Sequence, residues 1–532
     1  MNPYLVLSAE EMRAAEQAAM DAGTASAALM ETAGERAAEL IQRAWSRRPV
    51  AVVCGPGNNG GDGFVVAREL ASAGWSVRLG LIGDREALKG DARLMADLYE
   101  GEIAPFSPNV LNGAGLIVDA IFGTGLAREV EGAPKAAIEA MNAAPAPVFA
   151  IDLPSGVNAD TGAVMGTAVQ AARTITFQAR KPGHLLFPGR ALAGAVDIAD
   201  IGISDEATMK AGVETFENHP ALWGALFPRP QWGGHKYTRG SVMAVSGGPL
   251  NTGAIRLAAE GALRIGAGLV TVLSPQEAAP VHAAHLTAIM LRVSDNADHL
   301  AAHLKDAERI PMCVIAGPAN SVGEKTKENV LAILNSKAGA VLDADALTSF
   351  ADDPAAVFSA LRPEDVLTPH TGEFARLFPE EFKLLQEGEG KLAAVRAASA
   401  RAGCVVVLKG ADTVIAAPPN EAGARVLINA NAPPDLATAG AGDVLAGFIA
   451  GLRAQGMDGF AAAGAGVWIH GAAGQVAGPG LIAEDLPGAV PAVLRQLFAP
   501  PQQQAQQQAP QQEPQQGSQA GAQPGGGGGA QQ

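Results

Sequence analysis

Three polar loops rich in glycine follow short apolar runs in the first 160 residues. They read GPGNNGGDG (55–63), VDAIFGTGL (118–126) and AIDLPSG (150–156). Ligands of parallel sheets bind at the carboxyl ends of the strands, so these loops are expected to meet in one crevice. The first loop would offer backbone N–H groups and a helix N-terminus to a phosphate. The oxygen atoms of Asn59, Asp119 and Ser155 would suit a hard cation there.

Two plainer interpretations apply to the same loops. Gly55, Gly57 and Gly60 match the G-x-G-x-x-G pattern of a dinucleotide-binding dehydrogenase, and Asp84 follows at the spacing of a ribose-binding acid. Alternatively, Asp, Asn, Ser and Gly are the ordinary residues of turns and helix caps. A dehydrogenase turn needs no adjacent pair of asparagines, and three polar glycine loops at successive strand ends favour a ligand site.

The second half carries its clearest signal in TAGAGDVLAGFIAGL (438–452), a glycine-rich turn that opens an apolar helix. The free N–H groups and dipole of such a helix form an anion site. Asp443 in the first turn could accept a proton from a hydroxyl group near a phosphate, although Asp is also a common helix cap. VVVLKGADT (405–413) places a lysine after a buried strand, and TPHTGEFARL (368–377) places His370 at another strand end.

Short apolar runs alternate with helical stretches over the first 500 residues, which predicts parallel sheets covered by helices. A proline-rich stretch at 218–231 is predicted to link two different α/β domains, at 1–217 and 232–498. We expect the Gln-, Gly- and Pro-rich residues 499–532 to be a disordered tail. A capping box at 8–11 opens the first helix, and a helix over 64–73 should follow the first glycine loop.

The balance of charge excludes some classes of partner. The chain has 38 Lys and Arg against 54 Asp and Glu, a net charge of −16, which repels nucleic acid and anionic membranes. Its three cysteines show no metal-ligand spacing, and no signal peptide or transmembrane segment is apparent. A cytoplasmic protein with small-molecule partners is expected.

The three loops of the first half resemble those of the NAD(P)H-hydrate epimerase domain, and LSAEEMRAAEQAAM (7–20) resembles its opening helix. The resemblance covers about residues 1–215 and implies a potassium ion on Asn59, Asp119 and Ser155. It also implies that Asp152 is the acid/base that helps a C6 hydroxyl group leave and return. The implied substrate-binding residues are Asn58, Asn59, Gly60, Gly61, Asp62, Gly123, Thr124, Gly125, Leu126, Ala127, Arg128, Glu129 and Asp152.

Residues 228–498 resemble the ADP-dependent NAD(P)H-hydrate dehydratase, through the motifs above and the stretch from HKYTRG to IGAGLV (235–270). The resemblance implies a catalytic Asp443 and Mg²⁺ with the nucleotide. The implied hydrate-binding residues are Ala254, Gly317, His370 and Asp443, and the implied nucleotide-binding residues are Lys409, Gly410, Ala411, Asp412, Thr413 and Gly442. The chain departs from the family at GPANSVG (317–323), where more glycines are usual, and at Tyr237.

The resulting expectation is an α/β chain of two three-layer αβα domains, Rossmann-like and then ribokinase-like. It would epimerise the R and S forms of hydrated NADH and NADPH, and would dehydrate the S form with ADP to give NAD(P)H, AMP and phosphate. The resemblance also implies a homo-oligomer. The alternative is a ribokinase-like kinase of a small molecule, such as a vitamin precursor, fused to a non-catalytic Rossmann-like binding module.

Overall fold

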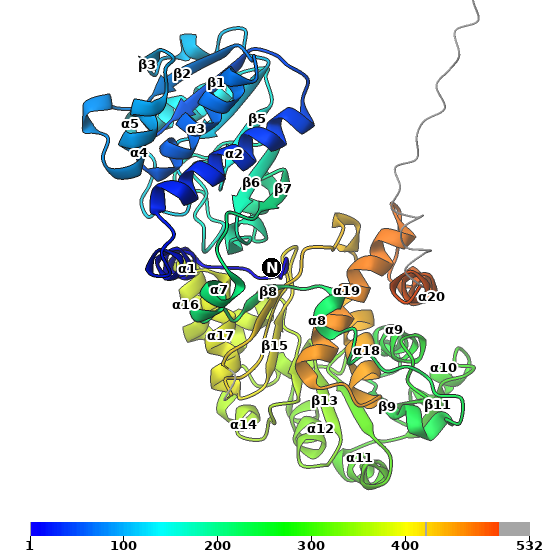
Figure 1. The fold of residues 1–532 in the computed structure, drawn as a ribbon. Helices are drawn as coiled ribbons and strands as arrows, with labels where there is room; N and C mark the ends of the chain where they lie inside the picture. Colours follow the sequence, from blue (N-terminus) through cyan, green and yellow to red (C-terminus); the bar gives the residue numbers. More distant parts are fainter. Residues whose placement is uncertain (1, 421–422, 500–532) are drawn as a thin grey trace, which may run out of the picture.

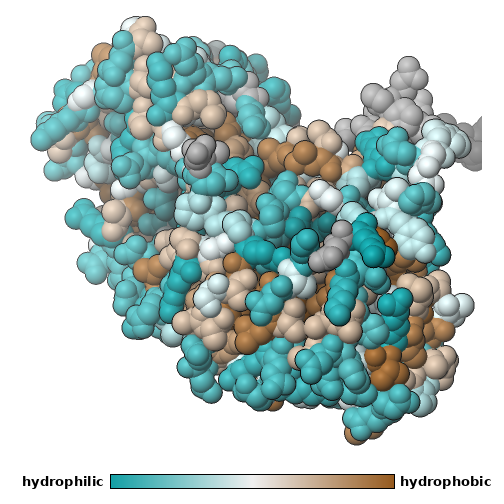
Figure 2. Space-filling view, turned by 90° about the horizontal axis from the view of Figure 1, so that it is seen from below, coloured by the Kyte–Doolittle hydropathy of each residue, from teal (hydrophilic) through white to brown (hydrophobic). Residues whose placement is uncertain are grey.

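The computed structural model describes residues 2–420 and 423–499, which form two α/β units, each built on its own sheet (Figure 1). The predicted disordered tail at 499–532 lies almost entirely outside the described residues. Hydrophilic residues cover much of the face seen in Figure 2, as expected for a chain with a net charge of −16. Within the described part of the chain, no helix is both long enough and apolar enough to cross a bilayer.

The first sheet has seven parallel strands in the order β3-β2-β1-β4-β5-β6-β7, which contains the strand order of Rossmann folds. The strands are β1 (Val50–Cys54), β2 (Val77–Leu81), β3 (Ile103–Pro105), β4 (Leu116–Ala120), β5 (Val148–Ile151), β6 (Arg173–Phe177) and β7 (Ala195–Ala199). The order reverses between β1 and β4, where a crevice for ligands is expected. The first two glycine loops follow these two strands, and the third follows β5.

Alternating residues of β1 face two separate cores, which defines the three layers. Val50, Val52 and Cys54 pack with α2 (Ser26–Ala44) and α3 (Asn58–Ser72). Ala51 and Val53 pack on the opposite face with α5 (Gly132–Ala143). The predicted three-layer αβα architecture is confirmed for this unit.

The second sheet has ten strands in the order β11-β10-β9-β12-β13-β14-β15-β16-β17-β8. The first seven strands in this order, from β11 at the edge to β15, are parallel to one another. Strand β16 is antiparallel to both of its neighbours. Their bounds are β8 (Thr215–Glu217), β9 (Ser241–Val245), β10 (Leu269–Ser274), β11 (Met290–Val293), β12 (Met312–Ala316), β13 (Gly339–Leu342), β14 (Val366–Leu367), β15 (Val405–Leu408), β16 (Val414–Ala416) and β17 (Val426–Ile428).

Helices cover both faces of this sheet as well. Met243 and Val245 of β9 share a core with α12 (Glu324–Leu334), α15 (Thr371–Leu377) and α17 (Lys391–Ala402). Val242 and Ala244 share the other core with α9 (Thr252–Arg264), α18 (Ala441–Ala454) and α19 (Gly459–Ala477). The α/β class with two different helix-covered sheets is therefore confirmed.

The remaining helices lie at the edges of these layers or connect them. They are α1 (Ala9–Asp21), α4 (Gly90–Leu98), α6 (Gly189–Leu192), α7 (Asp205–Lys210), α8 (Pro220–Trp223), α10 (Ala279–Ala283), α11 (Ala297–Leu304), α13 (Asp345–Thr348), α14 (Pro354–Phe358), α16 (Pro379–Gln386) and α20 (Asp485–Leu497). Helix α1 begins with the predicted capping box, because Ser8 and Glu11 exchange side-chain-to-backbone hydrogen bonds.

One helix start differs from the prediction. Helix α3 begins at Asn58 rather than at residue 64, so Asn58 to Asp62 form its first turn instead of a loop. The glycines there fit a helix because they are packed: a Cβ atom at Gly61 would lie 2.4 Å from the Met30 sulfur. The unpaired N–H groups of a helix N-terminus therefore face the end of β1.

The domain boundaries at 217 and 232 stay a prediction, and the structure adds two details near them. Strand β8 pairs with β17, so residues 215–217 extend the second sheet. Trp223 and Phe227 of the predicted linker are buried in a core shared with α18, α19 and α20. The connection between the units is thus packed against the second one.

Candidate active sites

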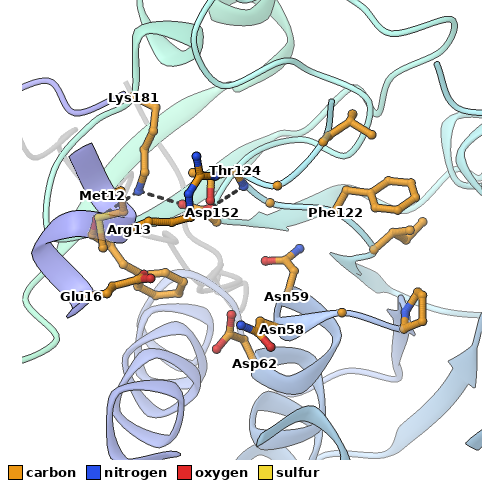
Figure 3. A pocket seen from close by; sticks show the side chains of 17 residues that line it. Met12, Arg13, Glu16, Asn58, Asn59, Asp62, Phe122, Thr124, Asp152 and Lys181 are labelled. Atoms are coloured by element: carbon orange, nitrogen blue, oxygen red, sulfur yellow. Dashed lines mark hydrogen bonds and ion pairs between the residues drawn. The ribbon is translucent and has the colours of Figure 1, made fainter. Parts of the chain in front are cut away.

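A cavity of about 410 Å³ lies at the carboxyl edge of the first sheet, where the three glycine loops meet. Figure 3 shows Asp152 and Lys181 on one side of it, Asp62 on the other, and Glu16 reaching in from α1. The predicted site residues that line the cavity are Asn58, Asn59, Asp62, Gly123, Thr124, Gly125, Leu126 and Asp152.

Other predicted substrate-binding residues do not line this cavity. Gly60 and Gly61 are buried in helix packing, and a Cβ atom at Gly60 would lie 1.9 Å from the carbonyl oxygen of Gly55. Ala127, Arg128 and Glu129 are exposed beyond the cavity lining. The two glycines therefore allow α3 to approach the end of β1, which brings its first turn to the cavity.

Asp152 follows β5 with a backbone φ of 65°, in the left-handed region that costs a non-glycine residue energy. Its carboxylate accepts hydrogen bonds from Lys181 Nζ (2.9 Å), Thr176 Oγ1 (3.1 Å) and the Thr124 N–H (3.0 Å). Burial alone would raise the pKa of Asp152, but the charge and hydrogen bond of Lys181, together with His184 and the Thr124 N–H, hold that pKa below its ordinary value. Asp152 is thus an ionised carboxylate in a strained position, which is typical of a functional residue.

Lys181 is the largest omission of the sequence analysis. Its side chain is 1% exposed, and its ammonium group also donates to Thr176 Oγ1 and the Phe177 carbonyl. His184 accepts from the Lys181 N–H through Nδ1, so its Nε2 carries the proton and donates to the Asp152 carbonyl (2.8 Å). Burial and the Lys181 charge lower the pKa of His184 to about 4, which keeps it neutral. The signal available in the sequence was the polar stretch after a fourth strand end, RKPGH (180–184).

Asp62 lies across the cavity from Asp152, and the pKa values of the two carboxyl groups are shifted in opposite directions. Burial raises the pKa of Asp62 well above its ordinary value, and the Asp152 and Glu16 charges add to the effect. Burial also raises the pKa of Glu16. Two facing carboxyl groups with separated pKa values can divide the roles of proton donor and proton acceptor.

Asp119 and Ser155 lie beneath the cavity and form one polar cluster. Ser155 Oγ donates to Asp119 Oδ1 (2.6 Å), and the Ser155 N–H donates to Oδ2 (2.8 Å). Burial raises the pKa of Asp119 to about 6 despite these bonds, and no basic side chain of the described residues pairs with it. Asn59 Nδ2 is buried without a hydrogen-bond partner among the described residues. Carboxylate, hydroxyl and amide oxygens beside an unbalanced buried charge fit a hard monovalent cation.

The second unit has a cavity of about 750 Å³ between the turn after β15 and the N-terminus of α18. It includes most of the predicted nucleotide-binding residues. Predicted site residues in its lining are His370, Lys409, Gly410, Ala411, Thr413 and Gly442. The apolar side of the lining was not predicted, and it includes Phe187, Pro433, Pro434, Leu436 and Val467.

A cluster of carboxylates surrounds Lys409 at one end of this cavity. Lys409 Nζ lies 2.6 Å from Asp343 Oδ1 and 4.0 Å from Glu373 Oε2. Burial, together with the nearby Asp343 charge, raises the pKa of Asp443 to about 6. Ala344, directly after Asp343, has a backbone φ of 47°, a second strained position at a strand end. Asp443 can therefore exchange protons near neutral pH beside a fixed ammonium group.

Helix α18 points its N-terminus at this cluster. A Cβ atom at Gly442 would lie 3.4 Å from Lys409 Nζ, so the first turn of the helix closely approaches the ammonium group. Gly440 at the N-cap has a φ of 87°, which a side chain would disfavour. Free N–H groups, a helix dipole and a lysine together form a site for phosphate oxygens.

The other predicted residues of this half have different surroundings. His370 caps α15, since its Nδ1 accepts from the N–H groups of Gly372 and Glu373, and its ring also lines the cavity. Asp412 pairs with Lys391 (2.7 Å) and does not line the cavity. The cavity lining also lacks Ala254, Gly317 and Asp443. Gly317 nevertheless lies close to the cluster, because its Cβ atom would be 1.7 Å from the Asp343 carbonyl oxygen.

The departure at GPANSVG places non-glycine residues in left-handed conformations, with φ of 53° at Ala319 and 71° at Ser321. Replacing the exposed Ser321 by Gly is expected to stabilise the chain by about 0.5–1 kcal/mol, because glycine adopts this φ without strain. Ser359→Gly is the matched control, since Ser359 has a φ of −65° and should lose stability. Urea unfolding checks both; a destabilised Ser321→Gly variant would contradict the prediction.

Comparison with known proteins places the two halves in named families. Residues 26–183 match the model of the YjeF-related protein N-terminus, and residues 242–483 match the model of NAD(P)H-hydrate dehydratase. The bifunctional NAD(P)H-hydrate repair enzyme of Moorella thermoacetica is 38% identical, covering 93% of this chain and 97% of its own. That of Escherichia coli is 34% identical, covering 91% and 93%.

A solved structure resembles about half of the chain. The ADP/ATP-dependent NAD(P)H-hydrate dehydratase of Bacillus subtilis, crystallised with ATP and Mg²⁺, is 25% identical with a TM-score of 0.44, covering 53% of this chain and 98% of its own. The full-length relatives confirm the predicted repair function over the alternative of a vitamin-precursor kinase fused to a non-catalytic module. The chain belongs to the family of bifunctional NAD(P)H-hydrate repair enzymes.

Proposed function

We propose that the first cavity epimerises hydrated NADH and NADPH and that the second dehydrates the S epimer with ADP. The observation that carries the first assignment is the Asp152 carboxylate, paired with Lys181, in the same cavity as Asp62, whose pKa is raised by burial. The second rests on Asp443 beside the Lys409 cluster at the N-terminus of α18. Both sites lie at the carboxyl ends of their sheets, where α/β folds bind ligands.

In the epimerase site, the C6 hydroxyl group of the substrate has to leave and return on the opposite face of the ring. The Asp62 carboxyl group would protonate the departing hydroxyl while the ring nitrogen supplies the electron pair. Asp152 would then take a proton from the water that adds to C6. Asn59, Asp119 and Ser155 would hold potassium, whose positive charge would stabilise anionic oxygen in the site.

In the dehydratase site, Asp443 would take the proton of the C6 hydroxyl group, and the oxygen would attack the terminal phosphorus of ADP and displace AMP. The ring nitrogen would then expel phosphate from C6, and loss of the C5 proton would give NAD(P)H. Lys409 and the N–H groups of α18 would bind the phosphate oxygens. Mg²⁺ would accompany the nucleotide and neutralise its charge.

The direct test is recovery of 340 nm absorbance from a mixture of both NADH-hydrate epimers, with Mg²⁺, K⁺ and either ADP or ATP. Complete recovery with ADP is expected, because epimerisation supplies the S form as it is consumed. Recovery that stops at the S fraction would contradict the epimerase assignment. No recovery with either nucleotide would contradict the dehydratase assignment. The homo-oligomer and the cytoplasmic location remain predictions.

Replacing Lys181 by Met should shift the pH dependence of epimerisation. The ammonium group lowers the pKa of Asp152, so its removal should raise that pKa. Asp152 would then be protonated as the pH falls through a higher value, and the acid limb of the pH–rate profile should move up. The profile of Lys391→Met, which removes a lysine paired with Asp412 in the other unit, provides the control. An unshifted acid limb would mean that Lys181 does not set the charge of Asp152.

A further inference from the structure

The first unit contributes to the wall of the second cavity. Phe187 and Arg190, which precede β7 of the first sheet, line this cavity together with the turn at 409–413 and the segment at 429–437. They end a stretch that begins with Lys181 and His184 in the epimerase site. One short segment of the first unit therefore contacts both sites.

Apolar packing fixes this segment on the second unit. Leu185 and Leu186 are 3% and 1% exposed, and both belong to the core that contains β13, β15 and α15. The Phe187 N–H donates to Asp412 Oδ2 (2.9 Å), whose other oxygen pairs with Lys391. The position of Phe187 is thus set by the two buried leucines that precede it and by a backbone hydrogen bond.

Arg190 connects the two loops that form the cavity. Its guanidinium group donates to the carbonyl oxygens of Ala411 (3.2 Å) and Ala430. Burial lowers the pKa of Arg190, with partial compensation from the Asp412 charge, and no carboxylate of the described residues forms an ion pair with it. A guanidinium group has five donors, so donors remain for a further acceptor.

Phe187 presents an aromatic surface at the same place. Phe187 is 43% exposed although Leu185 and Leu186 before it are buried, and the Arg190 guanidinium carbon lies 5.4 Å from its ring centre. Pro433, Pro434 and Leu436 line the cavity as well. An aromatic ring backed by a cation, among apolar residues and a few polar groups, suits a planar heterocycle. The phosphate site at Lys409 lies in the lining of the same cavity.

We propose that Phe187 of the first unit contacts the adenine base of the nucleotide used by the second unit, and that Arg190 positions the loops at 411 and 430 around it. This inference rests on the proposed dehydratase function. It makes the first unit part of the nucleotide site of the second, in addition to its own reaction. Arg190 is a positioning residue, whereas Phe187 touches the ligand.

The test compares the binding of two probes, ADP and inorganic pyrophosphate, to the full chain by titration calorimetry with Mg²⁺. Phe187→Ala should weaken ADP binding about tenfold, the effect of losing one aromatic contact, and should leave pyrophosphate binding unchanged because that probe has no base. Phe187→Tyr should restore ADP binding, since it keeps the ring. Leu98→Ala, which shortens a similarly exposed side chain of α4 (48%), is the matched control.

Arg190→Ala should raise the KM for ADP by tenfold or more and lower kcat much less. Arg190→Lys should not restore the wild-type KM, because one ammonium group cannot bridge the carbonyl oxygens of both loops. If Phe187→Ala weakened the binding of ADP and pyrophosphate equally, or left ADP binding as in wild type, the inference would be overturned and the proposed function would stand. Absence of ADP binding by the wild-type chain would overturn the proposed function as well.

Discussion

Replacing Asp443 by Asn should abolish dehydration of hydrated NADH and leave its epimerisation active. Asn has the shape of Asp but cannot accept the proton of the C6 hydroxyl group, so we expect a loss of about 10²–10⁴-fold in kcat, the usual worth of a general base. Asp443 is partly buried in the second unit, and the two cavities are lined by different residues. The epimerase site should therefore be unaffected.

The measurement is the rate of 340 nm recovery with saturating ADP, together with chromatographic exchange of the two epimers. Because burial and Asp343 raise the pKa of Asp443 to about 6, its basic form dominates above that pH, and wild-type kcat should rise as the pH increases through 6. Dehydration within tenfold of wild type in Asp443→Asn would assign the proton transfer to a different group. Loss of both activities would mean that the two sites are not independent.

The positions of the loops could be predicted because each signal is local. A run of apolar residues followed by glycine and polar residues identifies a strand end, and VAVVC, LIVDA and VFAI all form strands of the first sheet. The start of α3 could not be predicted, since glycines normally oppose helix formation. Here Gly60 and Gly61 are in the helix because Gly55 and Met30 leave no space for larger side chains.

The residues that the sequence analysis missed depend on contacts across the fold. Lys181 reaches Asp152 because β5 and β6 are adjacent parallel strands in a register that pairs Ile151 with Ile175. Neither residue type nor spacing signals that register. Phe187 and Arg190 lie in one sequence domain and line a cavity of the other, which no motif within either half indicates. The raised pKa values of Asp62 and Asp443 likewise arise from burial and from carboxylates that are distant in the sequence but close in the fold.

Replacing Asp152 by Asn should reduce epimerisation by about 10²–10⁴-fold, because the amide cannot accept a proton from the water that adds to C6. Asn is the suitable substitute, since it tolerates the left-handed φ of 65° at this position better than most residues. Dehydration of the pure S epimer should continue. The measurement is the exchange of R and S epimers followed without ADP, and exchange close to the wild-type rate would assign the acid/base role elsewhere.

A stability measurement separates this catalytic effect from a structural one. The Lys181 side chain is 1% exposed, and Asp152→Asn removes the carboxylate that pairs with its ammonium group. Breaking such a buried ion pair costs about 3–5 kcal/mol of stability. The double variant Asp152→Asn with Lys181→Met removes both charges and should recover much of that stability. If Asp152 is the acid/base, the double variant folds well yet still fails to exchange the epimers. Recovery of exchange together with stability would show that Asp152 only balances the charge of Lys181.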